Sequence, residues 1–491
     1  MLSILNLTKT NKLILATFAF LAVMASGSGR AHAATLNVSG GCTLPIAINS
    51  VNAGSDQSGC TAIVSPEGYG TNDTITIPAG TQMLTADSPT ISVSVKIQGA
   101  GMSQTTIDGN AGQYRTIRIN SSTAVVTVQD LKIASYLGQG IISTNGSVTL
   151  SNIEIDGTNA LPTGNQLKGV ELGNSAAANV TTTANNVYIH DLDAAATSGV
   201  YAFNTSTPTA NIQNTTVANI HNSAGDAGAF FVLIAGTGTV NANVYNTTIN
   251  NITASAAALG FGSIGAALSG DTTISVIVKN VTVVGLDGST GSIGENSVAF
   301  FTGGAAATPH TSSVTMNVEN SLLTNNISDN VSSNCAELNG NAAFGGLTGT
   351  VTTGIISDGH NLSDDSTCTT FTQPGDQQNL ANLFSTLGPL QDNGGVVPTM
   401  ALLAGSPAIN AGGQVLGIST DARGVARNSC PSVGAYQFEG AVCSATTTNA
   451  NAGTNAAAPN TGINSVSLLG VVIATLLGLS AIGYSIAAKR N

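Results

Sequence analysis

The stretch Val148-Thr-Leu-Ser-Asn152-Ile-Glu-Ile155 places one Asn between two short runs of alternating side chains. An earlier copy reads Val126-Thr-Val-Gln-Asp130-Leu-Lys-Ile133, with Asp in the Asn position. Alternating β-branched residues are typical of strands with one buried face, and Asn is typical of tight turns. The pattern therefore predicts short strands joined at polar corners. Further copies follow, with their central Asn at Asn186, Asn214, Asn246, Asn280 and Asn320.

The copies recur at steps of 22, 34, 28, 32, 34 and 40 residues, counted between the Asn or Asp130 positions. Repeats of about 20–50 residues are typical of solenoids and propellers. A propeller blade needs four strands of steady length, whereas a β-helix coil tolerates longer loops without losing its stack. The uneven period therefore predicts an all-β chain with a parallel β-helix over residues 91–379. Asn residues at one corner of successive coils are expected to bond their neighbours through the side-chain amide.

Composition narrows the range of partners. Only 8% of the 491 residues are charged, Trp is absent and the net charge is −12. Long disordered chains are rich in charge and poor in Val and Ile, so we expect this chain to be ordered. Its acidic balance repels phosphate, which argues against nucleic acid as a partner.

The N-terminus has the composition of an export signal. Lys9 and Lys12 precede a short apolar run over residues 13–25, and Ala31-His32-Ala33 forms a small-x-small cleavage motif. This order predicts a secretory signal peptide over residues 1–33. The alternative, a first membrane helix, suffers because the apolar run is too short to span a bilayer.

The C-terminus has the composition of a membrane anchor. Residues 466–488 are uncharged and apolar, and Lys489-Arg490 follow them. At about 1.5 Å per residue this stretch is long enough to be a transmembrane helix, and the basic end places the last residues in the cytoplasm. Residues 441–458, rich in Ala, Thr and Asn, are expected to form a flexible linker before it.

A short motif precedes the predicted membrane helix. It consists of Pro459, Asn460, Thr461 and Gly462, and with the basic tail it resembles a cell-wall sorting signal of the Leu-Pro-x-Thr-Gly class. The resemblance implies a sortase and a cell-wall peptide as partners, with cleavage after Thr461. Ala458 stands where that class has Leu. The alternative is a membrane anchor that is never cut, so residues 459–491 are either a sorting signal or a plain anchor.

Six cysteines lie as three pairs that are near in sequence. We predict the disulfides Cys42–Cys60, Cys335–Cys368 and Cys430–Cys443, since each would close a short loop in an oxidising compartment. Buried free thiols are the alternative. No zinc-ligand spacing occurs among them.

Both flanks of the repeat resemble modules of right-handed parallel β-helix surface proteins. Cys42-Thr-Leu-Pro45-Ile46-Ala resembles the Cys-Ser-Leu-Arg-Glu-Ala domain, with Pro45 and Ile46 in place of Arg and Glu. Residues 388–439 resemble the choice-of-anchor Q domain, although Asn410 and Ser432 stand where that family has Asp. The resemblance implies an N-terminal cap over residues 34–90, a right-handed coil and a small C-terminal β domain over residues 380–440.

Three groups of acidic and His residues are candidates for catalysis or metal binding. They are Glu154 with Asp156, His190-Asp191 with Asp193, and Asp364-Asp365 near His360. Polysaccharide lyases need clustered carboxylates with a basic residue, and hydrolases need two facing carboxylates. Lys132, Lys168 and Lys279 are nearly the only bases in the coils, and we expect no acidic motif one coil away from a basic partner. The groups are therefore interpreted as solvated corner residues, with no metal or cofactor.

These features predict an exported, surface-anchored, non-enzymatic β-helix protein. Its expected role is adhesion to a carbohydrate or host surface, with membrane contact through the C-terminal helix. Two alternatives stay open: a polysaccharide lyase or hydrolase on the same scaffold, and a passive surface spacer.

Overall fold

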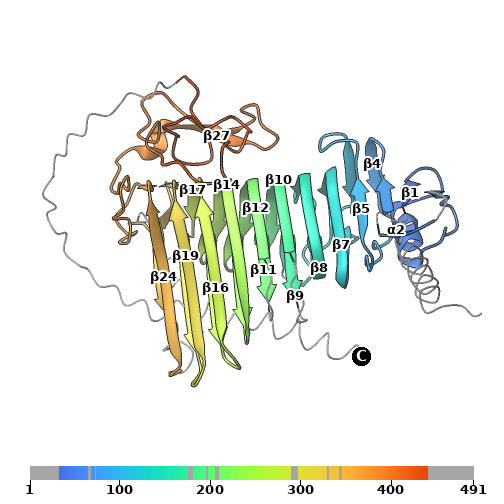
Figure 1. The fold of residues 1–491 in the computed structure, drawn as a ribbon, viewed down its shortest axis with the longest axis horizontal. Helices are drawn as coiled ribbons and strands as arrows, with labels where there is room; N and C mark the ends of the chain where they lie inside the picture. Colours follow the sequence, from blue (N-terminus) through green and yellow to red (C-terminus); the bar gives the residue numbers. More distant parts are fainter. Residues whose placement is uncertain are drawn as a thin grey trace, which may run out of the picture.

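The computed structural model describes residues 33–64, 68–71, 73–164, 166–174, 181–194, 197–204, 209–288, 297–328, 331–341 and 346–440. In these ranges the chain is almost entirely β-strand, and most strands belong to one long parallel sheet. Figure 1 shows the strands stacked side by side along one axis, in the order of the sequence. This is the architecture of a β-solenoid, as the repeat predicts.

The described chain starts with short strands and one helix. Helix α2 (Leu44–Ala53) begins with Pro in its first turn and ends at Gly54, whose positive φ of 64° suits a glycine. Its Leu44 and Ile48 side chains join the same apolar core as Ile75. The strands of this part are β1 (Ala34–Asn37), β2 (Ile63–Val64), β3 (Asp73–Thr76), β4 (Gly80–Met83), β5 (Val95–Gln98) and β6 (Thr105–Asp108).

Long strands that bend at the Asn positions form the body of the solenoid. Some of these strands continue through the corner, with one segment before it and one after it. In other coils the corner separates the two segments into two strands. They are β7 (Ile117–Ala134), β8 (Gln139–Asp156), β10 (Thr181–Ala194), β12 (Thr209–Asn222), β14 (Gly238–Ala254), β16 (Thr272–Lys279) with β17 (Thr282–Asp287), β19 (Thr311–Glu319) with β20 (Leu322–Thr324), and β24 (Thr350–Gly359) with β25 (Leu362–Ser363).

A second stack of parallel strands completes each coil. Its members pair in the order of the sequence. They are β9 (Leu167–Asn174), β11 (Thr197–Asn204), β13 (Ala227–Ala235), β15 (Ala258–Ala267), β18 (Ser297–Ala306) and β23 (Cys335–Asn339). A two-stranded hairpin of β21 (Ile327–Ser328) and β22 (Val331–Ser332) projects between coils.

The register of the long strands reproduces the sequence period. Val126 pairs with Val148, Thr215 pairs with Thr247, and Val276 pairs with Met316. The inward side chains form one continuous apolar core, in which Phe261 stacks between Phe230 and Phe300 at ring-centroid distances of 5.0 and 5.7 Å. The coil spacing derived from the Asn positions is therefore confirmed.

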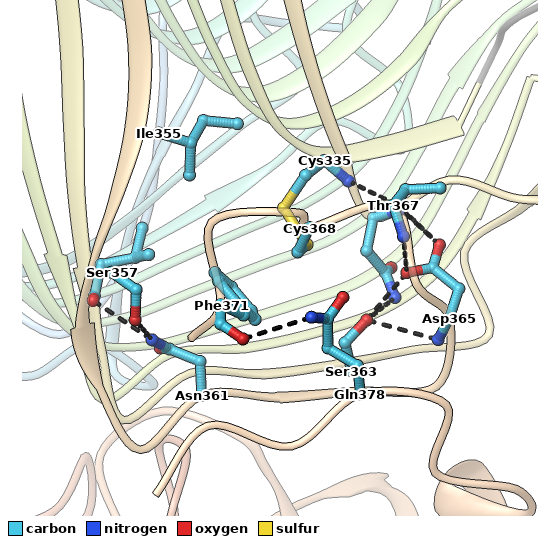
Figure 2. Close-up of a disulfide and its surroundings, with 12 residues drawn as sticks. Cys335, Ile355, Ser357, Asn361, Ser363, Asp365, Thr367, Cys368, Phe371 and Gln378 are labelled. Atoms are coloured by element: carbon cyan, nitrogen blue, oxygen red, sulfur yellow. Dashed lines mark hydrogen bonds between the residues drawn. A yellow bond between two sulfur atoms is a disulfide. The ribbon is translucent and has the colours of Figure 1, made fainter. Parts of the chain in front are cut away.

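Two of the three predicted disulfides are present. Cys42 bonds Cys60, and Cys335 bonds Cys368. The second bond lies beside buried Phe371 and a network of hydrogen bonds around Asp365 and Thr367 (Figure 2). Cys430 is also disulfide-bonded. Its predicted partner, Cys443, lies outside the described residues.

Residues 381–440, here called the C-terminal module, leave the last coil and lie on the flank of the solenoid (Figure 1). They contain the short helix η1 (Leu383–Thr386) and a hairpin of β26 (Leu387–Gln391) and β27 (Thr399–Leu402). Among the described residues no helix is long and apolar enough to cross a membrane. The predicted signal peptide, linker, sorting motif and membrane helix all lie outside those residues.

Candidate functional site

The repeated Asn residues occupy one corner of successive coils, as predicted. Each has a positive φ between 49° and 57°, a conformation that Asn tolerates better than most residues. Side-chain amides bond from coil to coil: Asn152 donates to Asp130 at 2.8 Å, Asn186 to Asn152 at 2.9 Å, and Asn246 to Asn214 at 3.1 Å. The corner therefore carries a ladder of side-chain hydrogen bonds between coils, which is displaced at Asn214, whose amide donates to Asn185 instead of Asn186.

The segment after this corner presents two columns of outward side chains. Lys132, Glu154 and Tyr188 are paired in register in one column. Asp156 and His190 are paired in the other. Side chains separated by a whole coil in sequence are thus neighbours on one sheet face, and the five form a single polar cluster.

Ion pairs join the members of this cluster. The Lys132 Nζ lies 2.8 Å from Glu154 Oε1 and 2.6 Å from Asp156 Oδ2. His190 Nε2 lies 3.3 Å from Glu154 Oε1, and its Nδ1 lies 2.7 Å from Asp191 Oδ2. The His190 ring stacks on Tyr188 with 4.2 Å between centroids. Each charged group therefore has an opposite partner.

These contacts shift the pKa values in the directions expected of ion pairs. Burial opposes ionisation of Asp156, but hydrogen bonds from Lys132 and Thr158 outweigh it and lower its pKa to about 2. Burial also opposes ionisation of Glu154, but its hydrogen bonds with His190 and Lys132 outweigh this and lower its pKa. Burial alone would lower the pKa of Lys132, yet Asp156 and Glu154 raise it. Both carboxylates and the ammonium are therefore charged at neutral pH.

An open groove of about 530 Å³ lies over this part of the face. Strands β6, β7 and β8 form its floor, and the turn after β8 forms one side. Its lining combines charges with hydroxyls and includes Thr106, Asp108, Lys132, Glu154, Asp156 and Thr158. The groove can accept a ligand rich in hydrogen-bonding groups.

The protonation states of Glu154, Asp156 and Lys132 do not suit the acid or base of a polysaccharide-cleaving enzyme. One ligand atom from each of Glu154, Asp156 and His190 lies within 4.8 Å of the others, a separation close to that of retaining glycosidases. A general acid, however, needs a raised carboxyl pKa, and here both are lowered. A lysine base needs a lowered pKa, and that of Lys132 is raised. The ammonium also lies between the carboxylates, where a metal cation would bind.

The structure corrects one expectation from the sequence. Acidic residues do lie one coil away from basic partners: Lys132 faces Glu154, and Lys279 faces Glu319 with 2.7 Å between Nζ and Oε2. The signal in the sequence was the spacing between the charged residues. Lys132 and Glu154 are 22 residues apart and Lys279 and Glu319 are 40 apart, which are the lengths of the coils at these positions. These residues are ion-paired across coils rather than being isolated at corners.

The remaining candidates do not join this cluster. Asp193 is exposed. Asp364 accepts hydrogen bonds from Thr324 and Asn334 near the Cys335–Cys368 disulfide. Asp365 accepts a hydrogen bond from Thr367.

His360 and Lys168 have separate surroundings. His360 Nδ1 lies 2.8 Å from the Ala411 carbonyl oxygen in the C-terminal module. Lys168 pairs with Glu171 at 2.9 Å within strand β9. The Asp364-Asp365 and His360 grouping is therefore divided between two structural roles, one at the end of the solenoid and one at the module.

Comparison with known proteins adds no identification. The chain matches no family model, no curated protein and no solved structure. The β-solenoid and the polar groove thus rest on the sequence and the structure alone.

Proposed function

We propose that this chain is an exported, non-enzymatic β-helix protein that is displayed on the cell surface and binds a ligand there. The observation that carries the proposal is the groove over Lys132, Glu154 and Asp156. Its polar groups are open to a ligand, while its charges are held in states that do not serve acid–base catalysis. A carbohydrate is the ligand class that best fits its mixture of hydroxyl, carboxylate and ammonium groups.

The two ends support surface display. A signal peptide over residues 1–33 directs export, and residues 459–491 hold the chain to the membrane or, after sortase cleavage at Thr461, to the cell wall. Two disulfides are compatible with an extracellular protein. We further propose a right-handed coil, an N-terminal cap over residues 34–90, and a choice-of-anchor Q-like module at residues 380–440.

The test is a glycan array probed with purified full-length protein, together with the Lys132→Met variant. Loss of the central ammonium removes the ion pairs of both carboxylates with Lys132 and leaves the groove with excess negative charge, so binding is expected to fall at least tenfold. Lys279→Met removes an ion pair outside the groove and serves as the matched control. Equal binding by all three proteins, or no binding to any glycan, would contradict a carbohydrate site in the groove.

A polysaccharide hydrolase is the second candidate, favoured by the carboxylate separation alone. Incubation of the same glycans with the protein, followed by analysis of reducing ends, separates the two. If the glycan is recovered intact, the result supports binding without hydrolysis. If the parent protein creates new reducing ends and the Glu154→Gln variant does not, the result supports hydrolysis.

A further inference from the structure

The C-terminal module covers the same sheet face that carries the polar cluster, but farther along the solenoid. Thr216, Thr248, Thr282, Leu322 and Leu362 continue the column that begins with Lys132, Glu154 and Tyr188. The module contacts this continuation. Thr216 Oγ1 donates to the Pro398 carbonyl at 2.6 Å, and the Ala435 amide donates to Thr282 Oγ1 at 3.0 Å.

The module is also attached to the Asn ladder by hydrogen bonds. Asn320 donates through Nδ2 to the Gly413 carbonyl and accepts through Oδ1 from the Gly413 amide, both at 2.8 Å. The Gly434 amide donates to the Asn320 carbonyl at 2.9 Å. Gly413 packs against the His360 ring so closely that an added Cβ would lie 2.7 Å from its Cδ2.

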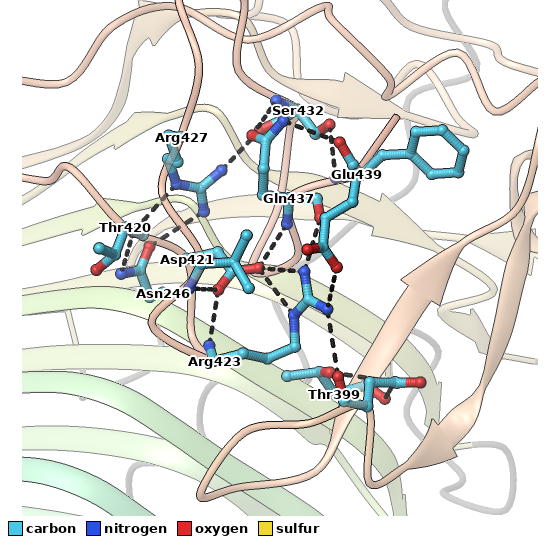
Figure 3. Close-up of polar contacts among 12 residues, drawn as sticks. Asn246, Thr399, Thr420, Asp421, Arg423, Arg427, Ser432, Gln437 and Glu439 are labelled. Atoms are coloured by element: carbon cyan, nitrogen blue, oxygen red, sulfur yellow. Dashed lines mark hydrogen bonds and ion pairs between the residues drawn. The ribbon is translucent and has the colours of Figure 1, made fainter. Parts of the chain in front are cut away.

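Arg427 links the module directly to the ladder residue Asn246 (Figure 3). Its Nη2 donates to Asn246 Oδ1 at 3.1 Å and to the Gly434 carbonyl at 2.8 Å. Its Nη1 donates to the Ser432 carbonyl at 2.9 Å. Burial lowers its pKa to about 10, so it is charged at neutral pH.

The contact from Arg427 coincides with a break in the ladder. In the neighbouring rungs, Asn246 donates to Asn214 and Asn320 donates to Asn280. The corresponding bond from Asn280 to Asn246 is absent. The Asn280 side chain is fully buried, and its Nδ2 has no hydrogen-bond partner, while Asn246 Oδ1 accepts from Arg427.

We propose that the C-terminal module is a releasable clasp, whose docking competes with one rung of the solenoid's own ladder. With the module docked, Arg427 bonds Asn246 and Asn280 is left unsatisfied. With the module lifted, Asn280 Nδ2 closes the missing rung onto Asn246 Oδ1. Burying an unsatisfied amide is unfavourable, so the docked state is weakened and release is partly compensated.

Release changes the accessible surface of the sheet. It uncovers Thr216, Thr248 and Asn250, which lie in the same columns as the polar cluster. It also uncovers the apolar Leu322 and Leu362, which pack against the module, so release has a hydrophobic cost. The open face then extends from the groove toward the C-terminal coils. The clasp therefore controls how much of this face a partner can reach, whatever ligand the groove takes.

The test is hydrogen–deuterium exchange on the full-length protein and two variants. In Arg427→Ala the amides of Gly413, Gly434 and Ala435 are expected to exchange at least tenfold faster, with strands β14, β16 and β19 unchanged. In Asn280→Asp, which suits the φ of 54° and keeps the oxygen that accepts from Asn320 but removes the competing donor, the same amides are expected to exchange more slowly than in the parent. Arg118→Ala on β7 is the control.

A crystal structure of Arg427→Ala provides the second measurement. The proposal expects Asn280 Nδ2 within hydrogen-bond distance of Asn246 Oδ1. An Asn280 that stays unpaired in this variant overturns it. So does exchange in Asn280→Asp that equals or exceeds that of the parent, and this second result stands even if Arg427→Ala does not fold.

Discussion

Asn residues at the coil corners combine two physical tasks. The left-handed backbone turns the chain from one sheet face to the next, and the side-chain amide bonds the coil before it. Gly would allow the turn without the bond, and Ser would allow the bond at a cost in backbone strain. Asn meets both requirements, which explains its repeated use at this corner.

The two tasks can be separated at Asn214, whose φ is 49°. Asn214→Gly removes the bonds to Asn185 and Asn246 but keeps the turn, whereas Asn214→Ala also strains the backbone. We expect both to destabilise the solenoid, with Ala worse by about 1–2 kcal/mol. Local free energies from native-state hydrogen exchange on β12 measure this, and equal values for the two variants would show that strain is unimportant.

The first corner was predictable from the sequence, but a second corner five residues later was not recognised. Ser135, Asp191, Asn219, Asn251, Gly285 and Asn325 all have positive φ there. Three of them form a second short ladder, in which Asn251 donates to Asn219 and Asn219 donates to Asp191. The residue type varies too much for a visible motif, although all members except Ser135 are Gly, Asn or Asp, which tolerate this backbone conformation.

The polar cluster provides a test by pH. The folded-state pKa of Asp156 is about 2, below its ordinary 3.8, so its ion pair stabilises the protein above pH 4 and is lost as pH falls toward 2. In Lys132→Met this loss is expected to shrink, with about 1–2 kcal/mol less acid dependence after allowance for solvent screening. Urea unfolding between pH 2 and 7 measures it, and Lys279→Met should keep the full dependence on Asp156.

At the scale of strands, the coil register was readable because each Asn marks one turn of the solenoid. The docking of the C-terminal module was not predicted. Its signal is the change in outward residues after the corner, from Lys132 and Glu154 to Leu322 and Leu362. Outward leucines in a solenoid need a cover, but the sequence does not say which segment provides it.

The last coil offers a prediction about its disulfide. Cys335–Cys368 closes a 33-residue separation, and its removal in Cys335→Ser/Cys368→Ser is expected to cost about 4 kcal/mol by the loop-entropy model. The loss should be local, because a solenoid coil contacts only its neighbours. Limited proteolysis should then cut within residues 364–380 first. If residues 364–380 resist proteolysis equally in the variant and in the parent, the hydrogen bonds of Asp365 are sufficient to hold this segment without the disulfide.

At the scale of the whole molecule, attachment decides how the solenoid is displayed. The proposed sortase cleavage requires the enzyme's thiolate to reach the Thr461 carbonyl, so on this proposal Thr461→Ala should stay in the membrane fraction. The parent should resist detergent and be released by wall digestion. Equal extraction of both proteins by detergent alone would contradict the sorting motif and leave the plain membrane anchor.

The uneven coil lengths have a consequence for the order of folding. Each long strand pairs with one that lies only 22 to 40 residues earlier, so each new coil can add at once to the coils that have already formed. The contacts of the clasp form between more distant parts of the sequence, because Arg427 bonds Asn246 across a separation of 181 residues. The solenoid can therefore grow coil by coil from its N-terminal end, and the clasp closes only after the coils up to Asn320 have formed.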